Sequence, residues 1–400
     1  MPGPPAPFYP AHMKVLFVEA CNYQDFPVGG QLTWARQILS AFGDNLWLVG
    51  IATDETPLGT WGKLRIGDKS FPFFAIQRVT RRVKKPLIPR RWSTLRSLKR
   101  YKKAILQFPF DYSLCCAPEV LLALKDWDLP NLTYNFSGTE NPLRFSRRWY
   151  GRLLSGLYDR FFYSSLKRAR YLLAAADQAS IRQLVSSHPT ALGDRQIVSF
   201  PTRIDTSVFR ATSDFSARNE LQLPPDSCIV TTSGRLHWAK GWPLLVEAFR
   251  EFLSQYPDSY LYFLGDGDCR PDIERFIRSE NLADRVKLPG FQSQANLAKY
   301  LQSSDLFVMG SLQEGWSTAL LEAKGCHVPI CTTNFSSAKD IVRQGVDGFV
   351  VDSRDARVFS QQMARAIGLR PHGGKAEDDM EKYAVSRMKP DLLRIWGISQ

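Results

Sequence analysis

A chain of 400 residues is too long for one ordinary domain and has room for two of about 200 residues each. An apolar fraction of 44% fits a globular protein and excludes a mainly disordered one, and no apolar run approaches the ~18 residues of a membrane-spanning helix. The net charge is +13. Residues 1–200 hold 28 basic and 14 acidic residues, whereas residues 201–400 hold 24 basic and 25 acidic ones. The positive charge therefore lies in the first half, which predicts an anionic partner for that half.

The cysteine pattern argues against both disulfides and a zinc site. There are seven cysteines, an odd number, and no two are spaced as C-x2-C. Several lie in apolar runs, as buried free thiols do, so we expect a reducing cytoplasm. With only five scattered histidines, we expect no metal and no metal cofactor. Residues 1–12 are proline-rich and lack the basic and apolar regions of a signal peptide, so we interpret them as a disordered leader.

The first elements are typical of a nucleotide-binding α/β domain. Residues 13–18 form an apolar strand pattern, a loop ends in Gly29-Gly30, and a helix begins near Leu32. A lone pair of glycines is usually only a turn. Residues 46–51 predict the next strand, and residues 52–77 predict loops and short strands.

The tract of residues 78–103 holds twelve basic residues and no acidic one. From Arg91 onward, Trp92, Leu95, Leu98 and Tyr101 are spaced as on one helix face, which is typical of an amphipathic helix on an anionic membrane surface. An ordinary core-facing helix with a solvated basic side explains the same pattern. No recognised motif accompanies the charge, so we do not expect nucleic acid as a partner.

Further strands are predicted at residues 111–116, 132–136, 171–175, 228–233 and 260–264, and helices at 118–127 and 177–185. We expect a first domain over residues 13–200, a second over 201–375, and a closing helical segment over 376–400. The loop after the strand 228–233 carries Arg235 and Lys240, a pair of cations that suits a diphosphate. The Asp-x-Asp patterns at 126–128 and 266–268 invite a metal-binding interpretation, but such coincidences are frequent and we reject it.

Residues 305–351 predict a strand-helix-strand-helix unit. A strand over 305–309 leads to Glu314, and a helix opens at Ser317 and Thr318 and stops at Gly325. Glu322 lies about one turn inside this helix, whose free N–H groups and dipole suit a phosphate. A strand over 327–331 and a helix with a Ser337-x-x-Asp340 capping box follow.

This stretch resembles the donor-binding half of glycosyltransferase family 4, whose members are retaining enzymes with the GT-B fold. The resemblance rests on Glu314-Gly315-Trp316, Leu321-Glu322-Ala323, Val328-Pro329 and Gly345-x-x-Gly348, and extends with GRL-x4-KG at 234–241. This sequence departs from the usual family pattern at two places. It has Gly310 where the family usually has proline, and Ser317-Thr318 where the family usually has small or apolar residues. The resemblance implies two Rossmann-like, doubly wound parallel-sheet domains that face each other across a cleft. It also implies retaining, metal-independent transfer of a sugar from a UDP- or GDP-sugar.

The resemblance implies roles for particular residues. Glu314, Arg235 and Lys240 would be catalytic, and the donor would be held by Gly30, Arg235, Lys240, Phe291, Gln292, Glu314, Trp316, Ser317, Thr318, Ala319 and Glu322. The sugar or acceptor side would involve Ser137, Gly138, Glu140 and Arg144, with Ser137 where the family usually has histidine.

We therefore expect a cytoplasmic or peripheral membrane glycosyltransferase of cell-envelope or polysaccharide biosynthesis, acting on a lipid-linked or anionic glycan. The alternatives are a catalytically weak relative that binds a nucleotide sugar, suggested by Ser137, and a GT-B epimerase.

Overall fold

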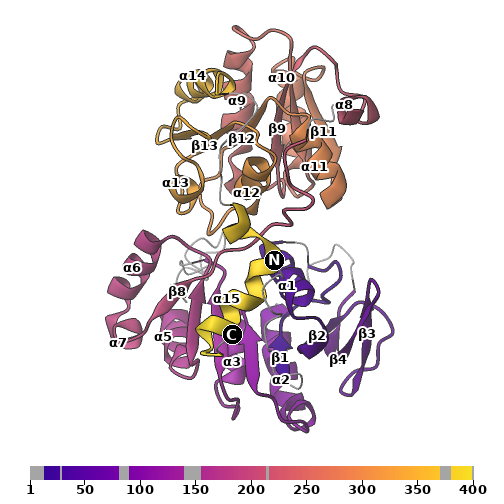
Figure 1. The fold of residues 1–400 in the computed structure, drawn as a ribbon, viewed down its shortest axis with the longest axis vertical. Coiled ribbons are helices and arrows are strands. Elements are labelled where there is room, and N and C mark those ends of the chain that lie inside the picture. Colours follow the sequence, from indigo (N-terminus) through magenta and orange to yellow (C-terminus); the bar gives the residue numbers. More distant parts are fainter. Residues whose placement is uncertain are drawn as a thin grey trace, which may run out of the picture. The chain divides into compact units, whose positions relative to one another are not determined.

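The computed structural model describes residues 13–27, 29–80, 90–138, 155–212, 216–369 and 380–398. The chain forms two compact units (Figure 1). The first comprises residues 1–201 together with 385–400, and the second comprises residues 202–384. The predicted boundary lies between residues 200 and 201, and residues 376–400 were predicted as a separate closing segment.

An eight-stranded sheet in the order β3-β4-β2-β1-β5-β6-β7-β8 forms the centre of the first unit. All neighbouring strands are parallel except β3 and β4. The strands are β1 (Val15–Val18), β2 (Leu46–Ala52), β3 (Trp61–Ile66), β4 (Lys69–Arg78), β5 (Tyr112–Cys115), β6 (Leu132–Phe136), β7 (Tyr171–Ala174) and β8 (Ile197–Ser199).

The prediction of short strands within residues 52–77 is wrong for β4, which is ten residues long. Phe73 and Phe74, consecutive residues of β4, point to opposite faces of the sheet and enter two different hydrophobic cores. A strand that is buried on both faces has a continuous apolar sequence. The alternation of apolar and polar residues that identifies a half-buried strand is therefore missing from β4.

Helices cover both faces of this sheet, so the unit is doubly wound. Val15 and Phe17 of β1 belong to the core beneath α1 (Gly30–Phe42) and α15 (Met388–Ile395). Leu16 and Val18, the alternating residues, belong to the core beneath α2 (Arg90–Ile105), α3 (Pro118–Leu124) and α5 (Ser155–Leu166). The remaining helices are α6 (Gln178–Ser187) and α7 (Pro189–Leu192).

Helix α2 is the structural counterpart of the basic tract, of which residues 81–89 lie outside the described part. Leu98 is fully buried, as are Thr94 and Ile105, whereas the side chain of Trp92 is 68% exposed. The four apolar residues therefore do not form one exposed stripe. Leu98 packs in the core between β4 and α3, as the core-facing interpretation expects, and the outer side of the helix is basic.

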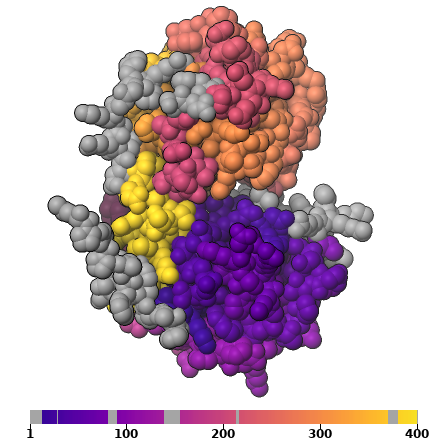
Figure 2. Space-filling model, turned by 45° about the vertical axis from the view of Figure 1, so that its right-hand side comes forward, coloured from indigo at the N-terminus to yellow at the C-terminus, as the bar shows by residue number. Residues whose placement is uncertain are grey.

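The segment after residue 384 packs onto the first unit. Trp396 stacks on Tyr112 with ring centroids 4.2 Å apart, and its Nε1–H donates to the Thr133 hydroxyl at 2.9 Å. Met388 and Leu392 of α15 are fully buried beside α1. In Figure 2 this yellow segment lies directly against the indigo surface of the first residues. The helix is shorter than the predicted 376–400, since short 3-10 turns, η3 (Met380–Tyr383) and η4 (Val385–Arg387), precede it.

The second unit contains a six-stranded, wholly parallel sheet in the order β11-β10-β9-β12-β13-β14. Its strands are β9 (Cys228–Ser233), β10 (Ser259–Leu264), β11 (Val286–Gly290), β12 (Leu306–Met309), β13 (Ile330–Thr333) and β14 (Gly348–Val351). Its helices are α8 (Ser216–Glu220), α9 (Trp242–Phe252), α10 (Arg270–Ser279), α11 (Gln294–Gln302), α12 (Thr318–Gly325), α13 (Ala338–Ile341) and α14 (Ala356–Ile367).

The strand order reverses once in each sheet, next to the first strand of the unit. In the second unit the reversal lies between β9 and β12, and in the first it lies between β1 and β5. Open parallel sheets bind ligands outside the carboxyl ends of the strands at such a switch point. We therefore expect ligand-binding residues in the loops that follow β9, β12, β1 and β5.

Candidate functional site

The loops at the switch point of the second unit pack backbone against backbone. Gly241 follows the β9 loop with a φ of +63°, and a Cβ atom there would lie 1.8 Å from the Gly310 carbonyl oxygen. A Cβ atom on Gly265, after β10, would lie 1.9 Å from the Gly234 carbonyl oxygen. Glycine is required at both positions, because any side chain would push the loops apart. Gly265, which precedes Asp266, therefore allows the loop after β10 to pack closely against the loop after β9.

Lys240 and Glu314 form an ion pair across this junction. The Lys240 ammonium contacts Glu314 Oε1, and the Ser311 hydroxyl donates to the same oxygen at 2.8 Å. Both side chains are largely buried, with exposed fractions of 33% for Lys240 and 18% for Glu314. Arg354 donates to the carbonyl oxygens of Gly310 and Ser311 and so fixes the backbone that carries Glu314.

Glu322 is the second carboxyl near Lys240. It lies in the second turn of α12, and burial raises its pKa to about 7 from an ordinary value of 4.5, while the Lys240 charge acts in the opposite direction. A single ammonium therefore influences two carboxyl groups, one on each side of the start of α12. The structure brings Lys240, Glu314 and Glu322 together as the sequence predicted.

Arg235 lies in the same loop as Lys240 but has a different partner. Its guanidinium pairs with Asp268 at 3.2 Å, and both side chains are substantially exposed. Arg235 and Lys240 both line a small pocket of about 20 Å³ at the carboxyl end of β9. The two cations thus border one space, although only Lys240 is paired with a predicted catalytic residue.

The start of α12 offers backbone donors beside these side chains. Ser317 caps the helix through its hydroxyl, which accepts from the Leu320 N–H at 3.4 Å. Within the described residues, the N–H groups of Thr318 and Ala319 have no protein acceptor. The Ser317 N–H is already donated to the Ser337 hydroxyl at 3.2 Å. The predicted capping box at Ser337 is wrong for this reason, since its hydroxyl makes no cap bond in α13.

The predicted base-binding residues follow β11. The side chain of Phe291 is 72% exposed, and the Gln292 amide donates back to the Pro289 and Gly290 carbonyl oxygens at 3.3 Å. They lie at the surface, on the same carboxyl edge of the sheet as Arg235 and Glu314. Trp316 is partly buried and approaches Tyr383 with ring centroids 6.1 Å apart.

The predicted sugar-side residues belong to the first unit. Gly30 is the first residue of α1. Ser137 and Gly138 directly follow β6 and line a cavity of about 460 Å³. Glu140 and Arg144 lie outside the described residues. No local sequence signal indicates this cavity, because its walls come from seven helices and strands that are spread along the chain.

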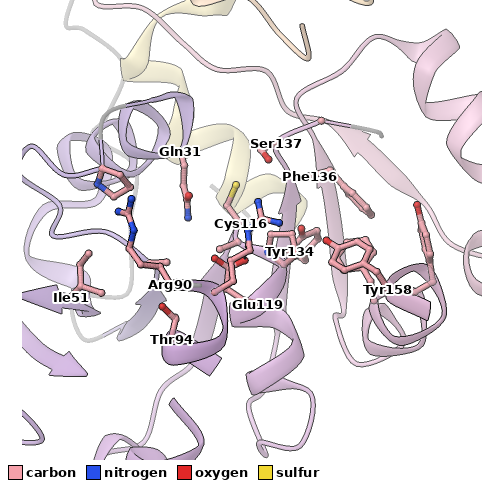
Figure 3. Close-up of a pocket in the computed structure, with 18 of the residues that line it drawn as sticks. Gln31, Ile51, Arg90, Thr94, Cys116, Glu119, Tyr134, Phe136, Ser137 and Tyr158 are labelled. Carbon is pink, nitrogen blue, oxygen red and sulfur yellow. Dashed lines mark ion pairs between the residues drawn. The ribbon is translucent and has the colours of Figure 1, made fainter. Parts of the chain in front are cut away.

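The cavity has one aromatic and one polar side (Figure 3). Tyr134, Phe136 and Tyr158 lie on the aromatic side, where Tyr158 and Phe162 stack with an interplanar angle of 9°. The polar side is lined by side chains from several helices and strands, namely Gln31, Gln77, Arg90, Arg91, Thr94 and Glu119. A combination of flat aromatic rings and hydrogen-bonding groups suits a polyhydroxylated ring.

Glu19, directly after β1, was also missed. Its side chain is fully buried behind the cavity wall, where it accepts from the Gln31 amide and from the Cys116 backbone N–H. Burial raises its pKa to about 8, and the hydrogen bonds from Gln31 and Cys116 act against this rise. An acidic residue at the end of an apolar strand run was the available signal.

Residues 213–387 match the family model described as glycosyl transferases group 1. Nearly all of this match lies in the second unit. The lipopolysaccharide core biosynthesis glycosyltransferase LpsE of Rhizobium meliloti is 29% identical over 150 residues, 38% of this chain and 42% of LpsE. An Escherichia coli UDP-Gal:alpha-D-GlcNAc-diphosphoundecaprenol alpha-1,3-galactosyltransferase is 30% identical over 149 residues, 36% of this chain and 38% of that enzyme. The matched segment is less than half the length of each relative.

Solved structures extend the likeness to the first unit. Sucrose-phosphate synthase from Thermosynechococcus elongatus superposes with a TM-score of 0.76 at 17% identity, covering 96% of this chain and 98% of that one. Anabaena HepE in complex with UDP and glucose superposes with a TM-score of 0.70 at 16% identity, covering 96% and 100%. The chain has the GT-B fold, as the sequence predicted.

Two further findings concern metal ions and membranes. Among the residues that the structure describes, no group of three or more His, Cys, Asp or Glu side chains is placed to hold a metal ion. Within the same part of the chain, no helix combines the length and apolarity needed to cross a membrane.

Proposed function

We propose that the chain is a retaining glycosyltransferase that moves a sugar from a nucleotide-sugar donor to a glycan acceptor without a metal ion. The observation that carries the proposal is the cluster at the start of α12, where Lys240 lies near both Glu314 and Glu322. The group 1 match of the second unit supports the reaction class. HepE, a structural neighbour, was solved with UDP-glucose, which supports a UDP-sugar as the first donor to test.

The leaving diphosphate would be stabilised by positive charge. Lys240, Arg235 and the N–H groups of Thr318 and Ala319 all border the carboxyl edge between β9 and β12. Fixed donors aimed at developing negative charge lower a barrier because they need no reorganisation during the reaction. A bound diphosphate would exchange the Asp268 partner of Arg235 for phosphate oxygens.

The two carboxyl groups would have different tasks. Glu314 precedes the helix N-terminus and would orient the donor sugar, whereas Glu322 lies inside the helix and would accept hydrogen bonds from the ribose. Ser311 holds Glu314 in place through the hydrogen bond to Oε1. We do not assign Glu314 as a covalent nucleophile. Retention of anomeric configuration is part of the proposal and rests on the resemblance to family 4.

The acceptor would be a lipid-linked or anionic glycan of cell-envelope biosynthesis, whose sugar would enter the 460 Å³ cavity beside Ser137 and Gly138. The names of two relatives, a lipopolysaccharide core enzyme and a diphosphoundecaprenol galactosyltransferase, support this class. All seven cysteines are free, which supports a cytoplasmic site of action. The outer side of α2 would contact an anionic membrane surface, since Trp92, Arg96, Lys99 and Lys103 are all exposed and share one helix face.

The test is a donor panel of UDP-glucose, UDP-galactose, UDP-N-acetylglucosamine and GDP-mannose, assayed with EDTA present. Release of nucleoside diphosphate, with an α-linked product seen by NMR, is expected for one donor. Binding of a nucleotide sugar without turnover would favour the catalytically weak relative suggested by Ser137. Conversion of a UDP-sugar into its epimer would favour the epimerase. Loss of activity with EDTA would contradict metal independence.

A further inference from the structure

A buried acid behind the cavity of the first unit has no task in the reaction proposed above. Glu19 is fully buried, yet both of its carboxyl oxygens are engaged at the cavity wall. One accepts from the Gln31 side chain on α1, and the other accepts from the Cys116 backbone N–H after β5. Gln31 and Cys116 both line the cavity and lie beside each other in Figure 3.

The position of Glu19 explains why its carboxyl connects these groups. It follows β1, and the switch point of the sheet lies between β1 and β5. The loops after these two strands and the first turn of α1 come together only there. A carboxyl group can accept from two donors at once, whereas an apolar residue of the same size would leave the Cys116 N–H without an acceptor.

We propose that Glu19 is a positioning residue for sugar recognition: through Gln31 it fixes the hydrogen-bonding pattern that the cavity presents to a pyranose ring of the acceptor. One amide hydrogen of Gln31 is committed to Glu19, so its carbonyl oxygen is left to accept from a ring hydroxyl. Glu119 and Arg91, which approach each other to 3.9 Å in the same cavity, offer further acceptors and donors to neighbouring hydroxyls.

The chemistry of the walls favours a sugar ring over a flat or fully apolar ligand. Tyr158 and Phe162 present stacked rings on one side, and aromatic faces pack well against the C–H face of a pyranose. The opposite side holds amides, a carboxylate and a guanidinium, which match hydroxyl groups that both donate and accept. A cavity of about 460 Å³ is in the range that encloses a small ligand.

This inference rests on the proposed function only in naming the bound sugar as the acceptor, so its first test measures binding without turnover. Methyl α-glucoside, α-galactoside, α-mannoside and α-N-acetylglucosaminide serve as probes in saturation-transfer NMR titrations of the full chain. The variants are Glu19→Ala, Gln31→Ala, the double variant and Glu19→Gln. Thr33→Ala is the control, since Thr33 lies on the same helix and its hydroxyl contacts the Gly29 carbonyl oxygen.

If Glu19 acts through Gln31, the two alanine variants weaken the best-bound glycoside by a similar factor, roughly tenfold, and the double variant weakens it no further. Glu19→Gln keeps a side-chain acceptor for the Cys116 N–H, but its NH2 group meets the Gln31 NH2 group. Gln31 must then turn its amide and present a donor to the cavity, so this variant should also weaken the best-bound glycoside. Thr33→Ala leaves binding unchanged. Glu19→Met, which fills a similar space, replaces Glu19→Ala if the latter does not fold.

A second readout separates this inference from the proposed function. With UDP-glucose as donor and octyl glycosides as acceptors, Glu19→Ala should raise the acceptor KM and leave UDP affinity and UDP-glucose hydrolysis unchanged. Additive losses in the double variant, an unaffected Glu19→Ala, or no binding of any probe by the wild type would each overturn the role of Glu19. Absence of all turnover with intact glycoside binding would instead count against the proposed function alone.

Discussion

The switch points of the two units differ in the size and in the lining of the space beside them. In the second unit, the space between the β9 and β12 loops is only about 20 Å³, and charged side chains of the protein pair with one another across it. In the first unit, the equivalent edge opens into a cavity of about 460 Å³, which is lined by aromatic rings, by amides and by arginine and acidic side chains. The same topology therefore supports a compact site lined by two cations and a roomy cavity lined by aromatic rings, amides and charges of both signs.

The contrast follows from the residues placed after each first strand. After β9 the chain continues with Gly234 and Arg235, whose neighbouring loops approach so closely that glycine is required at Gly241 and Gly265. After β1 it continues with Glu19, which turns inward and is buried. Close backbone packing and paired charges suit a diphosphate, whereas a cavity supported from behind suits a sugar ring.

The largest expected effect comes from removing a cation from the charged site. Arg235→Ala or Lys240→Ala should lower kcat about a hundredfold or more, because one preorganised donor to a developing anion is typically worth ~3 kcal/mol. Steady-state kinetics with the best nucleotide sugar measures this. Arg250→Ala is the matched control, since Arg250 makes only surface ion pairs with Glu251 and Glu280 in the same unit. Wild-type turnover by both folded variants would show that the two cations of the second unit do not stabilise a leaving diphosphate.

The two carboxyl groups near Lys240 sharpen the comparison. Glu322→Gln should weaken binding of free nucleoside diphosphate roughly tenfold, because its acceptor oxygens would face the ribose. Glu314→Gln should leave that affinity nearly unchanged and lower transfer, because Glu314 would face the sugar. Calorimetry with UDP, followed by transfer kinetics, distinguishes the two. Equal losses of UDP affinity in both variants would show that the carboxyl groups share one role.

The buried acid of the first unit predicts a pH effect on stability. Glu19 has a pKa of about 8 in the folded chain and an ordinary value of 4.5. Its contribution to stability is fully present below pH 4.5. This contribution to stability declines as the pH rises towards 8, because the Glu19 carboxyl group loses its proton at a lower pH in the unfolded chain than in the folded one. Since one pKa unit corresponds to ~1.4 kcal/mol, the total change is a few kcal/mol.

The thermal unfolding temperature of the wild type and Glu19→Gln, measured at pH 5 and pH 8.5, tests this effect. The drop between the two pH values should be smaller in the variant, since glutamine does not ionise. Glu55→Gln, at an exposed carboxyl paired with Arg78, should behave like the wild type. An identical drop in all three proteins would show that Glu19 does not titrate between these pH values.

The smallest expected effect concerns the outer side of α2. Each exposed cation near an anionic bilayer contributes up to ~1 kcal/mol, screened by salt. The chain should therefore sediment with anionic vesicles at low salt and be released at high salt. The triple variant Arg96→Ala/Lys99→Ala/Lys103→Ala should bind several-fold more weakly, whereas Lys63→Ala/Arg65→Ala on β3 should not change. Equal binding to neutral and anionic vesicles would mark α2 as an ordinary solvated helix.

Local signals in the sequence were enough for much of the second unit. The strand over residues 228–233, the start of α12 at Thr318 and its end at Gly325 all agree with the structure. Here apolar runs are short and are bounded by glycine or by a capping serine. The resemblance to family 4, and not a local signal, implied that Lys240, Glu314 and Glu322 belong to one site, and the structure places Lys240 near both carboxyl groups.

The first unit resisted prediction where burial comes from both sides or from distant elements. The ten-residue β4 looked irregular because its phenylalanines serve two cores. Two interpretations of α2 stayed open, because spacing alone does not say whether Leu98 faces solvent or β4. Glu19 and Gln31 are twelve residues apart, and nothing local indicates that Cys116 joins them. Such groupings depend on tertiary packing that no window of sequence contains.

The docking of α15 on the first unit has a consequence for how the protein is made. A ribosome completes all eight strands of the first sheet before it reaches Met388 and Trp396, and the whole second unit is synthesised in between. Throughout that interval, Tyr112 and Phe42 lack the indole that covers them in the finished protein. The core of the first unit is therefore completed only after the second unit has been synthesised. A fragment ending at residue 201 would lack α15 and would carry an exposed apolar face.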